Sequence, residues 1–375
     1  MKRHLQFGFS LIEVMVGLAI GMLAMIVVME VFVAFEGRKR TATGGADAQS
    51  NGAIALYMME RDARMAGWGI DAAAYGNCTT TFAYCDGSAN CGGVTGNPNL
   101  SFAAARITDG GTGPDSITMQ YFANPTDNTF NYPSGTTLRQ TQTSTTLPLN
   151  SVAGCTVTPN RSLILVSQAG QCTVLQATAI STTALNVTTA AGGFNPSVTY
   201  RTNNGWPLHV TGASASCFNP APNGALFRRS FNVDATTRQL RRSDNTGLND
   251  DGTPVIIANE MVASDILDLQ IQYGIAAANT QPINDWVDAT AGGAWSNPSV
   301  ANLKRIKAVR IAIVARSAQY EKPEGGGACT TTTSTTGWSS WATFNSAGYP
   351  ADWNCYRYKA FETVVPLRNV IWGNL

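Results

Sequence analysis

The chain has 375 residues, a formal net charge of +1 and only 13% charged residues. No basic patch indicates nucleic-acid binding, and no acidic tail indicates disorder. Abundant glycine, with serine and threonine in the middle of the chain, favours strands and turns.

The first 35 residues differ from all the others. A basic leader, residues 1–8, precedes an apolar run from Phe9 to Phe35 that is interrupted by Ser10, Glu13 and Glu30. As a helix this run spans about 40 Å, enough to cross a bilayer core of about 30 Å. A secretory signal peptide is disfavoured, because the run is too long and no cleavage site follows it; a buried core helix rarely runs so far without polar breaks.

Two carboxylates lie within the apolar run. A carboxylate at bilayer depth costs roughly 2.5–3.5 kcal/mol, so Glu13 is a candidate functional residue. Glu30 is expected to snorkel toward the interface or to pair within a helix bundle.

The segment Gly8-Phe9-Ser10-Leu11-Ile12-Glu13 resembles the leader motif of type IV pilins and type II secretion pseudopilins. The resemblance implies that a prepilin peptidase cuts between Gly8 and Phe9 and N-methylates Phe9. Glu13 would then be the fifth residue of the processed chain (13 − 8 = 5). In the family this carboxylate is thought to meet the amine of a neighbouring subunit. Such a pair is favourable where the dielectric constant is low.

A second part of the helix is expected over residues 36–69, with Arg38-Lys39-Arg40 marking the membrane exit. Gly44-Gly45 predicts a bend or local melting, because each glycine costs about 1 kcal/mol relative to alanine. Helical spacing predicts that one face packs on the following domain. This face contains Ile54, Tyr57, Met58, Arg61 and Met65, and Leu56, Met59 and Ala63 broaden it.

The end of this helix resembles the Asp-x-Arg-x-Ala-Gly-aromatic pattern of PilW-family minor pilins. The matching residues are Asp62, Arg64, Ala66, Gly67 and Trp68. We interpret the pattern structurally, with Gly67 permitting a turn and Trp68 anchoring the core. Lys304–Ser317 and 361–369 resemble the closing strands of the same family, whereas residues 75–260 match no motif.

Eight cysteines follow the apolar run: Cys78, Cys85, Cys91, Cys155, Cys172, Cys217, Cys329 and Cys355. Their even number, the absence of Cys-x-x-Cys spacing and the single histidine after the leader, His209, favour disulfides over zinc. Basic residues flank both ends of the apolar run, so the cysteines decide the topology and place the C-terminal part outside the cytoplasm. We expect Cys155 to pair with Cys172 and Cys329 with Cys355, the other four pairing among themselves.

The remaining chain predicts an antiparallel sheet of short strands. Strands are expected at 116–122, 163–167, 173–180, 184–188, 225–233, 238–242, 254–258, 266–275 and 305–316, with a short helix as the alternative near 260–268. The near-continuous apolar run 305–316 predicts a central strand covered on both faces. The segment 356–372 alternates less cleanly around Pro366.

Catalytic motifs are absent from the sequence. His209 is expected to be a surface or hydrogen-bonded residue, so neither enzymatic activity nor a cofactor is predicted. An acidic loop offers Asp244, Asn249 and Asp251 as a weak calcium site, but its order does not fit an EF-hand and a solvated hairpin turn is favoured.

These observations predict an α+β, type IV pilin-like fold in which a long N-terminal helix packs on a large antiparallel, disulfide-stapled β-rich head. The expected parts are the leader 1–8, the transmembrane or filament-core helix 9–35, its continuation 36–69 and the head 70–375. The chain is expected to be a single-pass inner-membrane protein with its head in the periplasm, and later at the pilus tip or cell surface.

The resemblance implies a minor pilin that co-assembles with other minor pilins and the major pilin, and that primes or caps the filament for adhesion and twitching motility. Expected partners also include the prepilin peptidase, the inner-membrane assembly platform and membrane lipid, with no direct nucleic-acid contact. Two alternatives stay open: a type II secretion tip pseudopilin, and a tip adhesin that binds through the loop around Trp338 and Trp341, unless these rings are packed.

Overall fold

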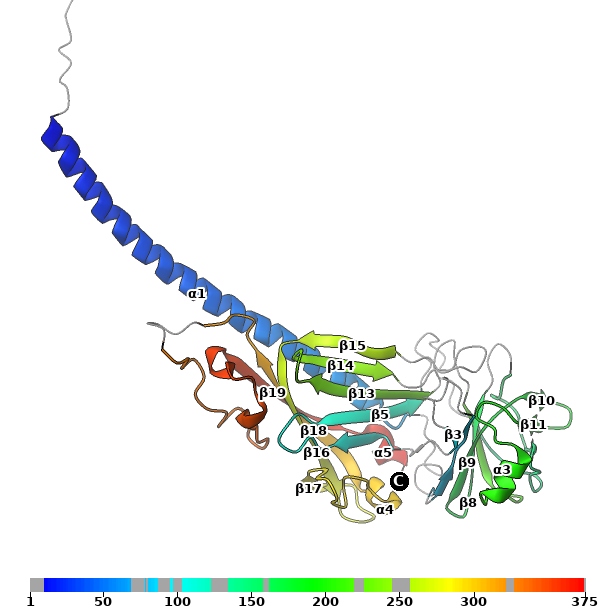
Figure 1. Ribbon diagram of the computed structural model, residues 1–375. Coiled ribbons are helices and arrows are strands. Elements are labelled where there is room, and N and C mark those ends of the chain that lie inside the picture. Colours follow the sequence, from blue (N-terminus) through cyan, green and yellow to red (C-terminus); the bar gives the residue numbers. More distant parts are fainter. Residues whose placement is uncertain are drawn as a thin grey trace, which may run out of the picture.

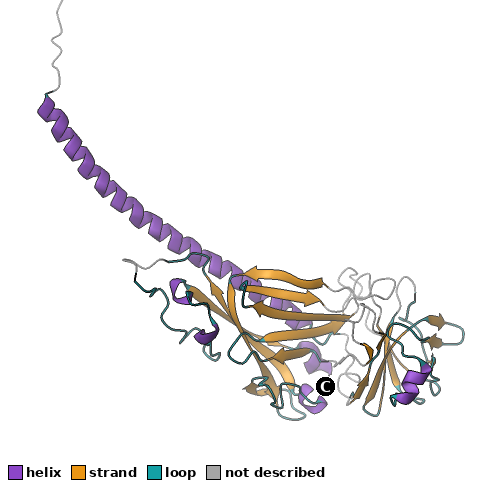
Figure 2. Cartoon of the chain, in the orientation of Figure 1, coloured by secondary structure: helices purple, strands orange, loops and turns teal. Residues whose placement is uncertain are grey.

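A single long helix carries a β-rich head on its C-terminal half (Figures 1 and 2). The computed structural model describes residues 10–68, 78, 80–86, 95–96, 103–122, 134–157, 162–218, 226–244, 257–321 and 327–373. The helix and the mainly antiparallel sheets make the fold α+β, as the sequence predicts.

Helix α1 (Leu11–Met65) begins at Ser10, whose side chain accepts a hydrogen bond from the Glu13 amide. Its segment Leu11–Glu36 is long and apolar enough to cross a membrane, and it extends away from the head (Figure 1). The helix curves without a break, so the predicted bend at Gly44-Gly45 is wrong. Gly44 is buried where a Cβ atom would lie 3.2 Å from Gln319 Cβ, so this glycine permits close packing and does not interrupt the helix.

The part of the head against α1, here named the helix-bound lobe, contains two sheets. One has the strand order β15-β14-β13-β5-β4, with bounds Ile257–Ser264, Gln239–Asp244, Leu226–Asp234, Ser116–Phe122 and Ala105–Thr108. The other has the order β17-β16-β18-β19, with bounds Ile283–Val287, Ile266–Ala276, Ile306–Arg316 and Tyr358–Pro366. Short helices complete this lobe: α4 (Val300–Leu303), α5 (Arg368–Gly373), η3 (Ser346–Gly348) and η4 (Trp353–Cys355).

Strand β18 is covered on both faces, as predicted. Ile311 and Ile313 join the main core with the buried residues of α1, whereas Ala312 and Val314 pack against Phe344 from the loop that follows Gly327. A helix near 260–268 is excluded, because β15 continues to Ser264 and β16 begins at Ile266.

Residues 134–218 form a second unit, here named the inserted lobe, and the segment 80–84 joins it because β1 pairs with its strand β9. Its larger sheet has the order β1-β9-β8-β12-β6, with bounds Thr80–Phe82, Gln171–Gln176, Leu163–Gln168, Ser214–Phe218 and Ser134–Thr137. A smaller sheet has the order β10-β11-β7, with bounds Ala179–Ser181, Asn186–Thr188 and Thr146–Pro148; helix α3 is Val198–Asn203, and β2 (Cys85–Asp86) pairs with β3 (Thr95–Gly96).

The inserted lobe interrupts the connection between two paired strands. Phe122 at the end of β5 is the register partner of Leu226 at the start of β13, and the chain forms the lobe between these two positions. One face of its larger sheet encloses a separate cluster that includes Ile164 and Leu175. The other face, with Leu165 and Val174, joins the main core.

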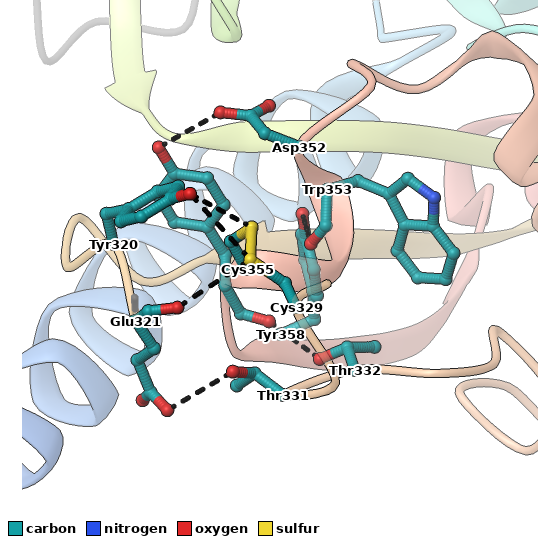
Figure 3. The surroundings of a disulfide bond; sticks show 10 residues. Tyr320, Glu321, Cys329, Thr331, Thr332, Asp352, Trp353, Cys355 and Tyr358 are labelled. Carbon is teal, nitrogen blue, oxygen red and sulfur yellow. Dashed lines mark hydrogen bonds between the residues drawn. A yellow bond between two sulfur atoms is a disulfide. The ribbon is translucent and has the colours of Figure 1, made fainter. Parts of the chain in front are cut away.

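Three disulfides lie among the described residues: Cys78–Cys172, Cys155–Cys217 and Cys329–Cys355. The last confirms the predicted pairing, and Figure 3 shows Tyr320 beside it, with its hydroxyl 3.4 Å from Cys355 Sγ. The predicted Cys155–Cys172 pair is wrong, because Cys172 joins the main core whereas Cys155 packs on the opposite face of the sheet. We also expected Cys78, Cys85, Cys91 and Cys217 to pair among themselves. The bonds Cys78–Cys172 and Cys155–Cys217 contradict this expectation. Cys91 and the side chain of Cys85 lie outside the described residues.

Candidate functional site

The start of α1 carries the residue that the sequence selects first. Gly8 and Phe9 lie outside the described residues, and Glu13 lies in the first helical turn. Glu13 Oε2 accepts a hydrogen bond from the Ser10 amide at 2.9 Å, while Ser10 Oγ accepts one from the Glu13 amide at 3.2 Å. This capping box holds a solvent-exposed carboxylate at the positive end of the helix dipole.

Among the residues that the structure describes, none outside α1 covers the apolar half of this helix. Its large side chains are exposed, and a shallow hollow is lined by Met25, Ile26, Met29, Glu30, Val33 and Ala34. So large an apolar surface requires lipid or other helices around it. The environment that Glu30 prefers stays a prediction.

The second half of α1 packs through small residues. Gly44, Ala48, Gly52, Ala55 and Ala63 are all buried. A Cβ atom on Gly52 would lie 2.1 Å from the Phe361 ring, so only glycine fits here without a shift.

The face predicted to pack on the head is wrong at its centre and right at its edge, because Met59 and Ala63 are buried in the main core and Leu56 packs against it. Ile54 is 47% exposed and Tyr57 is 63% exposed. Helical periodicity centred the face on the larger apolar side chains, whereas the helix contacts the sheets mainly through glycine and alanine, with Met59 as a large buried residue among them.

A buried ion pair connects α1 to the sheet that contains β5 and β13. Asp62 is 1% exposed, and its Oδ1 accepts hydrogen bonds from Arg229 Nη1 at 3.0 Å and from the Tyr121 hydroxyl at 3.2 Å. The Arg229 guanidinium also lies 5.7 Å from the centre of the Tyr121 ring. Since a buried charge needs a partner, these contacts fix how the end of the helix meets the head.

The end of α1 is closed by the C-terminal segment of the chain. Asn369 Nδ2 donates to the backbone carbonyls of Arg64, Met65 and Ala66 at 3.3, 3.3 and 3.1 Å. Gly67 has φ +81°, where glycine is favoured, and its amide donates to the Gln120 carbonyl at 2.8 Å. The structure thus brings together Asp62–Trp68 and the 361–369 segment, which lie at opposite ends of the head sequence.

The sequence did not indicate the partners at this junction. Tyr121, Arg229 and Asn369 are respectively 59, 167 and 303 residues from their contacts on α1. No local spacing connects residues so far apart. Only the two family-like segments indicated that both ends of the chain matter.

The other sequence candidates form no shared site. His209 is buried and hydrogen-bonded to Thr173 Oγ1 at 2.8 Å, and burial lowers the pKa of its imidazole to about 4. Asp244 ends β14, whereas Asn249 and Asp251 lie outside the described residues, so the calcium site stays a prediction.

The two loop tryptophans, Trp338 and Trp341, are engaged within the head. Trp338 stacks on Tyr349 with an interplanar angle of 9°, and Trp341 lies 4.3 Å below the Arg310 guanidinium. These contacts indicate that the two rings are packed within the head and argue against an open binding surface in this loop.

Comparison with known protein families gives two matches. A model described as Type IV Pilus-assembly protein W (PilW) matches residues 230–369, from β13 through Asn369. A model described as the prokaryotic N-terminal methylation motif matches residues 3–29, which include Gly8, Phe9 and Glu13. The inserted lobe lies outside both matches.

Among solved structures, a type IV-like pilin from Thermus thermophilus is similar with 10% sequence identity and a TM-score of 0.32. The similarity covers 87% of this chain and 97% of that chain. A TM-score this low does not by itself establish a shared fold. No curated protein matches the sequence.

Proposed function

We propose that the chain is a minor pilin of the PilW family that co-assembles with other minor pilins and with the major pilin to prime or cap a type IV pilus, because residues 230–369 match the PilW model and residues 3–29 match the N-terminal methylation motif. A pilin of this family would contact other pilus components and would have a structural role. The observation that carries the proposal is the uncovered apolar half of α1, which needs neighbouring helices once it leaves lipid.

In this proposal the prepilin peptidase cuts after Gly8 and methylates the new amine of Phe9. The Glu13 carboxylate then forms an ion pair with the N-terminal amine of a neighbouring subunit. The capping box supports this role, because Glu13 is already fixed at the helix start beside the new chain end. A carboxylate and an ammonium each lose hydration in an apolar bundle, and pairing offsets part of that loss.

The apolar helix and the N-terminal motif fit a membrane-anchored pilin. We place the head in the periplasm before assembly, because its three described disulfides form in an oxidising compartment. The two lobes make the head long, and such bulk is easiest to accommodate at a filament end, where helical neighbours do not limit it.

The test replaces Glu13 by alanine and by glutamine in the full-length protein. We expect fewer pili and loss of the subunit from those that remain, whereas Glu60→Gln, on the exposed helix outside the apolar run, leaves both unchanged. Mass spectrometry of the assembled polypeptide is expected to show a methylated Phe9 as its first residue. Unchanged piliation in Glu13→Ala, or a chain that begins at Met1, contradicts the proposal.

A type II secretion pseudopilin would share the leader, but the match over residues 230–369 favours a pilus. Deletion of the gene separates the two, because loss of piliation supports the pilus and loss of enzyme secretion supports the secretion system.

A further inference from the structure

The inserted lobe has an unusual charge pattern. Residues 128–233 contain no aspartate or glutamate, although the whole chain has 24. Within residues 134–218 there is no lysine, and the arginines are Arg139, Arg161 and Arg201. The rest of the lobe is rich in threonine, serine, asparagine and glutamine.

The charged groups that the structure describes in this lobe are tied to its own backbone. Arg201 is 5% exposed, and its guanidinium donates to the carbonyls of Ser144, Thr189 and Pro196. Arg139 donates to the Ala184 carbonyl at 2.7 Å and to Asn186 Oδ1 at 3.1 Å. Hydroxyl, amide and apolar groups therefore dominate the part of the surface that the structure describes.

Partly exposed aromatic rings gather where β1 meets α3, in what we name the aromatic cluster: Phe82, Tyr84, Tyr200 and Trp206. The rings of Tyr84 and Tyr200 meet edge to face at 4.8 Å, and those of Phe82 and Trp206 lie 5.8 Å apart. Helix α3 and the residues that follow it also expose Val198, Leu208 and Val210 by 48%, 53% and 48%.

The position of the lobe leaves this surface available. Figure 1 shows α3 and strands β8 to β11 at the end of the molecule opposite the apolar half of α1. The lobe also lies outside the family-matched residues 230–369, so the PilW match does not account for it.

We propose that the inserted lobe binds a neutral glycan at the aromatic cluster. Sugar rings present apolar C–H faces that pack on aromatic rings, and hydroxyl rims that suit uncharged hydroxyl and amide partners. The Arg201 guanidinium lies 5.8 Å from the centre of the Trp206 ring, but it is buried and donates its hydrogen bonds to backbone carbonyls. A charged ligand would therefore lose hydration here without gaining an accessible counter-charge. This binding activity goes beyond the proposed assembly role and does not depend on it.

The direct test measures binding of the purified full-length chain, in detergent, to immobilised polysaccharides. The neutral panel contains dextran, mannan, galactan and cellulose; the charged panel contains dextran sulfate and chitosan; an octyl surface tests apolar adsorption. We expect binding to at least one neutral polysaccharide that persists from about 0.01 to about 1 M salt, a range over which the Debye length falls from about 30 to about 3 Å. Binding to no neutral polysaccharide, or to a charged or octyl surface alone, overturns the proposal.

Point variants locate the site. Tyr200→Ala is expected to weaken binding roughly tenfold, the effect of one lost ring contact.

Thr182→Ala, in the exposed turn between β10 and β11, is the matched control and is expected to bind as the wild type does. Equal losses in Tyr200→Ala and Thr182→Ala, or unchanged binding in Tyr200→Ala, contradict the site. Because the assay needs no pilus, normal glycan binding alongside unaltered piliation in Glu13→Ala would overturn only the assembly proposal.

Discussion

The two lobes of the head are both made of short strands and disulfides, yet they use charge in opposite ways. The helix-bound lobe contains ion pairs such as Arg229–Asp62, Arg316–Asp265 and Arg242–Glu260. The inserted lobe has no acidic residue between 134 and 218. Directional ion pairs suit the lobe that must hold a long helix at a fixed angle, whereas a neutral surface suits contact with an uncharged ligand.

The largest expected effect is at the helix junction. Asp62→Ala leaves Arg229, whose side chain is 13% exposed, without its carboxylate, and removal of one partner of such a buried pair costs about 3–5 kcal/mol. Urea denaturation of the full-length chain in detergent measures this loss. Glu60→Ala, which breaks the surface pair with Arg64, is the control and is expected to cost no more than about 0.5 kcal/mol. Equal losses in the two variants would show that the buried pair does not hold the helix.

Removing a staple from the inserted lobe is expected to have a smaller and more local effect. The Cys155–Cys217 bond joins β12 to the lobe's own cluster across 62 residues, and its loss in Cys155→Ser/Cys217→Ser costs about 2–4 kcal/mol. Hydrogen exchange is expected to speed up in β8 and β12 and to stay unchanged in β18 and β19. Equal acceleration in all four strands would show that the lobes unfold as one unit.

Two glycines of α1 test the packing of the helix on the head. Gly52→Ala forces its Cβ against the Phe361 ring, and overpacking of this kind costs about 1–3 kcal/mol. Gly45 has nothing within 4 Å of an added Cβ, so Gly45→Ala is expected to stabilise the chain by about 0.5–1 kcal/mol. The two variants therefore change the denaturation midpoint in opposite directions. If Gly45→Ala destabilised the chain as Gly52→Ala does, the original prediction of a bend or local melting at Gly44-Gly45 would be supported instead.

Sequence patterns predicted the features that depend on neighbouring residues. The apolar helix, the alternation of β5 and the two-sided burial of β18 all arise from local periodicity, and each is confirmed. Gly44 and Ile54 show where this reasoning ends. Propensity describes glycine as a helix breaker, but contact with Ser317 and Gln319 makes Gly44 the residue that fits.

The junction needed information that no local pattern contains. Asn369 caps a helix that ends 303 residues earlier, and Cys172 and Cys155 look like partners until the sheet places them on opposite faces. The two segments that meet at the junction, Asp62–Trp68 and 361–369, could still be identified from the sequence, because both resemble PilW-family patterns.

The most gradual difference between the lobes is their response to pH. In the helix-bound lobe, Asp115 accepts hydrogen bonds from the Gly110 amide at 2.9 Å and from the Ile271 amide at 2.8 Å. Burial, followed by the neighbouring carboxylates Asp109 and Asp268, raises the pKa of Asp115 to about 7. The folded state therefore keeps a proton that the unfolded chain releases near pH 3.8, and the stability of this lobe falls as pH rises from about 4 to about 7.

His209 gives the inserted lobe the opposite response. Burial lowers the pKa of its imidazole from 6.5 to about 4, so the unfolded chain binds a proton that the folded lobe excludes. Stability of this lobe therefore rises with pH between about 4 and about 6.5.

Each group contributes a slope of at most about 1.4 kcal/mol per pH unit. Between about pH 5 and about pH 6.5, hydrogen exchange corrected for its intrinsic pH dependence is expected to show β5 and β16 losing protection while β8 and β9 gain it. Asp115→Asn is expected to weaken the first trend, to which Asp268 still contributes because burial also raises its pKa, and to leave the second trend unchanged. His209→Gln is expected to remove the second trend and to leave the first. If protection changed with pH in the same direction in both lobes, the proposed difference in charge between them would be contradicted. The inserted lobe, which has no carboxylate between residues 134 and 218, would then respond to pH as the helix-bound lobe does.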